Sequence, residues 1–177
     1  MAVERIEHLK NEKSKSNNNS VYSSIDPAPP LEENEKPNVK ELESILIDPK
    51  RSLFERYRAM FTLRNMNTDE SSLALASGLD CQDSALFRHE IAFVLGQMQK
   101  PVTVDKLAEA LSRIDENEMV RHECAEALGA ISDQKSNDIL HKYLQDDARV
   151  VRESAIVALD ISDYNNSDDF QFLDMNH

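Results

Sequence analysis

The sequence predicts an all-α fold, a solenoid of about four helix pairs, and two observations support this prediction. The first is composition: the 177 residues include 3 Gly, 6 Pro and no Trp, which favours helices joined by short polar turns. The second is a repeat. Four apolar stretches share one frame, and their common leucines lie 32, 33 and 31 residues apart, a period that indicates stacked supersecondary units. These leucines are Leu63, Leu95, Leu128 and Leu159.

Each apolar stretch follows a second helical segment, so each repeat is predicted to be a pair of helices. The preceding segments are "NVKELESILID", "DESSLALASGL", "VTVDKLAEAL" and "SNDILHKYLQ". Turn residues mark the joints: Ser84 can cap the helix that follows it, Pro101 can open a helix and Gly78 can end one. Short helices, short turns and a fixed period are typical of an α-solenoid of the HEAT kind.

The chain divides into four predicted segments. Residues 1–10 have apolar residues on one side of a short helix that resembles the last helix of a missing unit. Residues 11–38 hold four of the six prolines among many Asn and Ser, which predicts a flexible, disordered linker. Residues 39–161 carry the repeats, and residues 162–177 are predicted to be a frayed acidic tail.

Charge and cysteine content limit the partners and the compartment. The formal net charge is -13, which argues against binding nucleic acid and suits either an ordinary solvated surface or a cationic substrate. No stretch is apolar enough to suggest a membrane partner. Cys81 and Cys124 have no CxxC spacing and lie in apolar helices, which predicts buried free thiols and a cytoplasmic protein, or one that also enters the nucleus.

The phrase "RHE" occurs twice at the same place in the repeat, from Arg88 and from Arg121. At about 100° per residue, His89 and His122 fall roughly opposite the apolar stripe of their helices, so they are not core residues. Glu90 and Glu123 are rotated one step further round. The small residues that share a face with the histidines are expected to leave space beside each imidazole; they are Ala92, Gly96, Ala125 and Gly129.

Two readings of these pairs stay open at this point. An exposed histidine is usually only solvated, and small residues often serve only close helix packing. Repetition in register in two of the four units favours a ligand set, in which imidazole and carboxylate could bind ferrous iron or zinc. No HExxH motif, phosphate loop, catalytic triad or dinucleotide fingerprint is present, so any chemistry is predicted to be metal chemistry.

The sequence resembles one known family, the deoxyhypusine hydroxylases, which are HEAT-repeat metalloenzymes with paired His-Glu motifs. The resemblance covers nearly the whole chain and is similar to that family's second lobe only. It is carried by these phrases: "SLFERYRAMFTLRN", "SALFRHEIAFVLGQMQ", "MVRHECAEALGAI", "RVVRESAIVALD" and "DPAPP".

The resemblance implies an activity and a ligand set. Two lobes, each with two His-Glu motifs, hold a di-iron (Fe2+) centre that uses dioxygen to hydroxylate deoxyhypusine on translation initiation factor 5A, a monooxygenase reaction that forms hypusine. By this resemblance His89, Glu90, His122 and Glu123 bind iron. No further catalytic residue and no other cofactor is assigned.

Half of the family's ligands are missing from this chain, so activity is expected to need a complementary first lobe or a homodimer. The alternative is a non-catalytic HEAT-repeat scaffold that binds a basic protein. A third reading, a HEAT protein related to bilin lyases, is weighed against by the duplicated "RHE" phrases.

Overall fold

The computed structural model describes residue 28 and residues 37–167. The predicted short helix at 1–10, nearly all of the predicted linker and the last residues of the predicted tail lie outside this described part. Within it, every regular element is a helix, and none is long and apolar enough to cross a bilayer.

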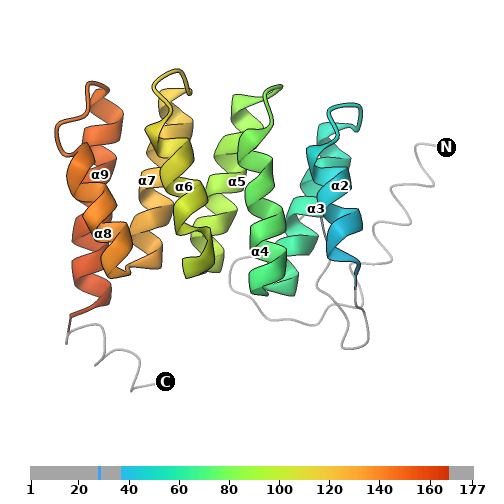
Figure 1. Ribbon diagram of the computed structural model, residues 1–177, viewed down its shortest axis with the longest axis horizontal. Coiled ribbons are helices and arrows are strands. Elements are labelled where there is room, and N and C mark those ends of the chain that lie inside the picture. Colours follow the sequence, from blue (N-terminus) through green and yellow to red (C-terminus); the bar gives the residue numbers. More distant parts are fainter. Residues whose placement is uncertain (1–27, 29–36, 168–177) are drawn as a thin grey trace, which may run out of the picture.

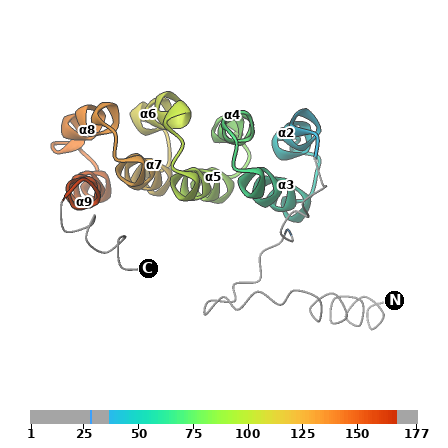
Figure 2. The same ribbon diagram turned by 90° about the horizontal axis from the view of Figure 1, so that it is seen from below.

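The helices form four consecutive pairs that stack side by side, which confirms the predicted all-α solenoid (Figure 1). Seen from below, the pairs make two layers (Figure 2). One, here the A layer, consists of α2 (Val39–Ile47), α4 (Asp69–Ala76), α6 (Val104–Ser112) and α8 (Gln134–Leu140). The other, here the B layer, consists of α3 (Leu53–Met66), α5 (Ala85–Met98), α7 (Glu118–Ile131) and α9 (Arg149–Asn165). Short 3-10 turns accompany the A helices: η1 (Ser77–Asp80), η2 (Pro101–Thr103) and η3 (His141–Tyr143).

Side-chain caps set where the first three B helices begin, and left-handed residues set where they end; α9 begins without a side-chain cap. Ser84 caps α5 by accepting a hydrogen bond from the Phe87 amide, as predicted. The first three B helices each end at a residue with positive φ, at equivalent repeat positions: Asn67, Gln99 and Ser132. The same turn therefore follows each of them, which keeps successive pairs in one orientation.

Three details differ from the predicted joints. Gly78 does not end a helix in the left-handed conformation; it lies within η1, where a β-carbon would meet the Ile91 side chain at 2.8 Å, so its role is close packing. Pro101 opens the 3-10 turn before α6 rather than α6 itself. The last helix runs to Asn165, beyond the boundary predicted at 161, because Ser162 is buried against the array and the Asn166 amide bonds to the Ser132 carbonyl.

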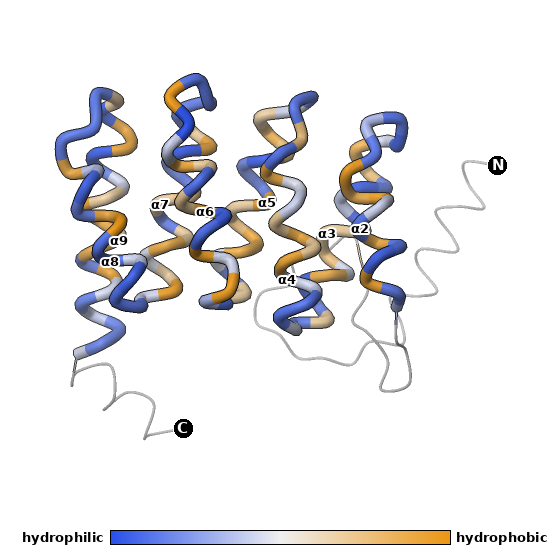
Figure 3. The backbone as a smooth tube through the Cα atoms, viewed as in Figure 1, coloured by the Kyte–Doolittle hydropathy of each residue, from blue (hydrophilic) through white to orange (hydrophobic). Residues whose placement is uncertain are grey.

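The hydrophobic core lies between the two layers. Leu63, Leu95 and Leu128 are fully buried there, while Leu159 on α9 is only partly buried because no further pair among the described residues covers it. Figure 3 shows hydrophobic residues recurring along every helix pair and hydrophilic residues at the turns. Cys81 and Cys124 are buried free thiols, as predicted.

A ladder of buried arginines joins consecutive repeats. Arg121 donates to the Leu111 carbonyl at the end of its own A helix and pairs with Asp146, which follows the next A helix, at 2.5 Å. Asp146 has a lowered pKa, mainly because of this hydrogen bond. The same two kinds of contact recur at Arg56, with the Leu46 carbonyl and Asp83, and at Arg88, with the Cys81 carbonyl and Glu116. Arg88 directly precedes His89, and Arg121 directly precedes His122. By fixing the rotation of α5 and α7 about their axes, these arginine contacts also fix the direction in which the two histidines point.

Candidate metal centre

The two histidines lie next to each other on the face of the B layer that points away from the A layer. His89 belongs to α5 and His122 to α7, one residue after Arg88 and Arg121 respectively. Their rings are tilted by 33° with centroids 6.4 Å apart, and both side chains are partly exposed. Equivalent positions of consecutive repeats are therefore neighbours on this face.

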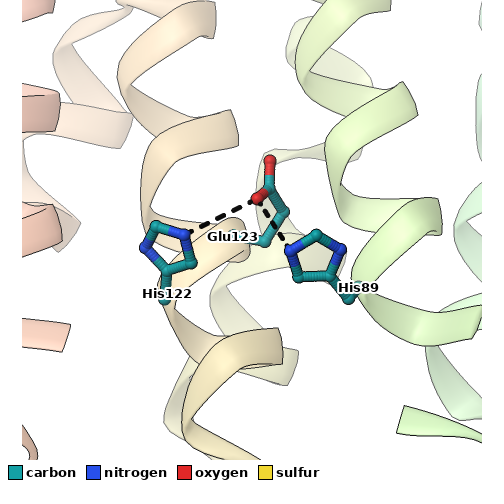
Figure 4. A group of neighbouring side chains, drawn as sticks. All are labelled: His89, His122 and Glu123. Atoms are coloured by element: carbon teal, nitrogen blue, oxygen red, sulfur yellow. Dashed lines mark ion pairs between the residues drawn. The ribbon is translucent and has the colours of Figure 1, made fainter. Parts of the chain in front are cut away.

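Glu123 completes a three-residue cluster between the two imidazoles (Figure 4). Its Oε2 atom lies 3.2 Å from Nε2 of His89 and 3.8 Å from Nε2 of His122. One ligand atom from each residue falls within 4.8 Å of the others. A cation bound about 2.1 Å from each of three ligands brings those ligand atoms to about 3 to 4 Å from one another, so the cluster has nearly the dimensions of a filled site.

The carboxylate of Glu123 stands in an electrostatically unfavourable place for an anion. Only 8% of the residue is exposed, and burial raises the pKa of Glu123 to about 7. The charges of Glu126 and Glu90 add to this rise, while His122 opposes it. A divalent cation at the cluster would offset the cost of ionising this buried carboxylate. The donor set, two imidazole nitrogens and one carboxylate oxygen, fits ferrous iron.

Glu90 lies outside this cluster, on the side of His89 that faces α3. Its Oε1 atom is 3.8 Å from Nδ1 of His89. The pKa of Tyr57 on α3 is raised, mainly by burial and additionally by the negative charge of Glu90. The structure thus brings together three of the four predicted ligands, and a metal role for Glu90 stays a prediction.

Two residues that the sequence did not single out contact His122. The Ser154 hydroxyl of α9 lies 2.6 Å from Nδ1 of His122, and Oε1 of Glu126 lies 3.4 Å from the same nitrogen. The repeat alignment could have pointed to Ser154, which occupies in the last repeat the position that Glu123 occupies in the third.

The small residues near the histidines pack neighbouring B helices together, which corrects the expectation that they leave space beside each imidazole. A β-carbon on Gly96 would lie 3.1 Å from the Ala127 α-carbon, and one on Gly129 would lie 2.6 Å from the Ala158 β-carbon. Ala92 and Ala125 are fully buried. Close approach of the helices is what brings the histidines and Glu123 within reach of one another.

Exposed apolar side chains flank the cluster on the same helix faces. Leu86 and Met119 lie one turn before His89 and His122, and Phe93 lies one turn after His89; each is more than two-fifths exposed. Large apolar residues beside polar ligands are typical of a surface that another protein covers.

The fold and a family model define the class of this protein. Residues 72–160, about half of the chain, match the family described as HEAT repeats, and the chain belongs to that family. Within this class its curated relatives are deoxyhypusine hydroxylases, so the resemblance noted from the sequence is confirmed.

Relatives from distant organisms match at similar levels. The deoxyhypusine hydroxylases of Drosophila melanogaster and Danio rerio are 51% and 50% identical to this chain, each over 98% of it and over 56% and 57% of their own length. That of Candida albicans is 51% identical over 97% of this chain and 55% of its own length. A solved structure of human deoxyhypusine hydroxylase in complex with glycerol is 51% identical, with a TM-score of 0.76, and the match covers 92% of this chain and 55% of that one. The chain therefore spans about half the length of these relatives.

Proposed function

We propose that this chain forms one lobe of a deoxyhypusine hydroxylase, a monooxygenase that converts deoxyhypusine on translation initiation factor 5A to hypusine. The observation that carries the proposal is the cluster of His89, His122 and Glu123 in a chain about 50% identical to enzymes of that name. The matched stretch, 98% of the chain, includes the residues from which the cluster is built.

In this proposal the two imidazoles and Glu123 hold a ferrous ion on the open face of the B layer. When bound, the iron would supply the activation of dioxygen that hydroxylation of a carbon–hydrogen bond requires. His89 and His122 provide neutral nitrogen ligands, and Glu123 provides the negative charge that compensates part of the charge of the cation. Glu90, 3.8 Å from the far side of His89, is placed to contact the cationic side chain of the substrate.

Three protein ligands leave coordination positions open, and we propose that a second lobe closes the site. It would be either a complementary first lobe or a second copy of this chain facing the first across a two-fold axis. The exposed apolar residues that flank the cluster, Leu86, Met119 and Phe93, support a protein partner on this face. The net charge of -13 suits a cationic substrate.

We place the protein in the cytoplasm, with entry into the nucleus open, because both cysteines are buried free thiols. That state suits a reducing compartment.

The test is a hydroxylation assay with iron-loaded protein prepared without oxygen. The protein is mixed with dioxygen and the deoxyhypusine form of translation initiation factor 5A, alone and with a complementary first lobe, and hypusine is detected by mass. Size-exclusion mass and iron content are measured in parallel. We expect hypusine when the site is completed, and none from His122→Ala. A chain that binds the factor equally well after His89→Ala and His122→Ala but never yields hypusine would instead be a non-catalytic scaffold.

A further inference from the structure

Ser154 lies where α9 meets the metal cluster. It is a buried residue, 5% exposed, two positions after Arg152, just as Glu123 comes two positions after Arg121. The B layer therefore carries a regular contact between consecutive repeats. In each contact, the residue directly after the arginine of one repeat meets the residue two positions after the arginine of the next repeat. His89 meets Glu123 in this way, and His122 meets Ser154.

The direction of the hydrogen bond between Ser154 and His122 follows from the other bond that the hydroxyl makes. The Ser154 Oγ atom lies 2.7 Å from the Val150 carbonyl, one turn earlier on α9, an acceptor to which the hydroxyl can donate its single proton. A hydroxyl that has already donated can only accept from a further partner. Both contacts of the hydroxyl can be hydrogen bonds at the same time only when Nδ1 of His122 carries a proton and donates it to Ser154 Oγ.

The second neighbour of this nitrogen supports the same assignment. Glu126 Oε1, 3.4 Å from Nδ1, is also an acceptor when ionised. With the proton on Nδ1, the neutral ring keeps its lone pair on Nε2, the atom that faces Glu123 Oε2 at 3.8 Å. That separation is too long for a hydrogen bond, so no hydrogen bond to Glu123 draws the proton to Nε2.

His89 lacks such a partner. Its Nδ1 is buried and makes no hydrogen bond with any described residue, and Glu90 Oε1 at 3.8 Å is beyond hydrogen-bond reach. The two histidines have the same sequence context but different support. His122 is supported through Nδ1 before any metal arrives, whereas among the described residues His89 has a partner within hydrogen-bond reach only at Nε2, 3.2 Å from Oε2 of Glu123.

We infer that Ser154 is a positioning residue, which acts through His122 by holding its Nδ1 proton and so presenting Nε2 to the metal. The inference rests on the proposed metal centre and adds a residue from the fourth repeat to it. The fourth repeat thus serves the site although it carries no His-Glu pair. Outer hydrogen-bond partners of metal-binding histidines commonly set metal affinity by about 10- to 100-fold.

Substitution Ser154→Ala tests the inference, with Ser162→Ala as its matched control. Both serines are buried on α9, and alanine favours a helix more than serine does, so neither variant should unfold. Position 162 lies two turns further along the helix, roughly 12 Å from the contact. The whole 177-residue chain is used, with Zn2+ as the probe, and the dissociation constant is measured by competition with a chelator.

The second readout is the imidazole nitrogen spectrum of His122, recorded by NMR without metal at about pH 8, where an ordinary imidazole is neutral. We expect the Nδ1-protonated form in the parent chain and in Ser162→Ala, and a mixture of the two tautomers in Ser154→Ala. We expect Zn2+ to bind Ser154→Ala about 10- to 100-fold more weakly than the parent, and Ser162→Ala with unchanged affinity.

A proton on Nε2 of His122 in the parent chain would overturn the inference, and so would Ser154→Ala that binds Zn2+ as tightly as the parent. Neither readout needs iron, dioxygen or substrate, so failure of the hydroxylation assay leaves both outcomes interpretable. A parent chain that binds no Zn2+ would contradict the metal centre, and the nitrogen spectrum would still decide how His122 is held.

Discussion

Substitution of Gly129 by alanine should separate α7 from α9 and weaken both the fold and the site. A β-carbon there would lie 2.6 Å from the Ala158 β-carbon and 2.7 Å from its α-carbon and carbonyl oxygen. Ordinary carbon contacts are about 3.5 to 4.0 Å, so α9 must move by roughly 1 Å. Because the obstructing atoms belong to the backbone and to a β-carbon, no side-chain rotation can relieve the overlap.

Two opposing effects, overpacking and helix propensity, determine how much Gly129→Ala changes the free energy of unfolding. Overpacking of this kind costs up to about 3 kcal/mol, and alanine gains about 1 kcal/mol over glycine within a helix. The free energy of unfolding should therefore fall by about 2 kcal/mol. Gly96→Ala is the matched control, because its β-carbon would lie 3.1 and 3.3 Å from the α- and β-carbons of Ala127 and needs a shift of only a few tenths of an ångström. The propensity gain should offset that cost.

Urea unfolding followed by circular dichroism measures both variants, and Zn2+ affinity measures the site. The Ser154–His122 contact of 2.6 Å would lengthen beyond about 3.2 Å if α9 moves as expected, so Gly129→Ala should also bind Zn2+ more weakly than Gly96→Ala. Equal stability of the two variants would refute the claim that these glycines set the spacing of the B helices.

Three further predictions follow from the buried charges. Arg121→Met should lower the free energy of unfolding by about 3 kcal/mol in urea titrations, because it leaves Asp146 without its partner. The control Arg149→Met removes an exposed ion pair and should leave the midpoint of urea unfolding unchanged. The pKa of Asp146 is lowered in the folded chain, so the ionised carboxylate contributes stability above its unfolded pKa of about 3.9. This contribution is lost as the pH falls through the lower folded pKa. Asp146→Asn should therefore flatten the dependence of stability on pH in that range, and an unchanged pH profile would contradict this. Glu123→Gln should weaken Zn2+ binding in a chelator competition more than Glu90→Gln does, and the reverse order would mean that Glu90 is the principal carboxylate ligand.

The fold could be predicted well from the sequence because every repeat of a solenoid carries the same pattern of apolar residues. Each repeat has apolar residues at the same places, so the period, the number of pairs and the orientation of His89 and His122 could all be found by aligning the chain with itself. The end of α9 was placed four residues too early. The acidic composition after residue 161 suggested fraying, and nothing local shows that Ser162 is buried against the array.

Contacts between residues distant in sequence were harder to predict. No role was predicted for the arginine of each "RHE" phrase, yet Arg121 binds a carbonyl 10 residues earlier and a carboxylate 25 residues later. Ser154 lies 32 residues from His122, and no local pattern indicates that the two side chains meet. The small residues were misjudged because helical phase gives the face on which a residue lies but not the distance to the next helix.

The most direct test of the metal centre is anomalous X-ray diffraction at the iron edge from crystals of this chain grown with Fe2+ in the absence of oxygen. We expect a peak within bonding distance of Nε2 of His89, Nε2 of His122 and Oε2 of Glu123, weakened or absent in crystals of Ser154→Ala grown in the same way. A peak elsewhere on the chain, or no peak at this cluster in the parent protein, would contradict it.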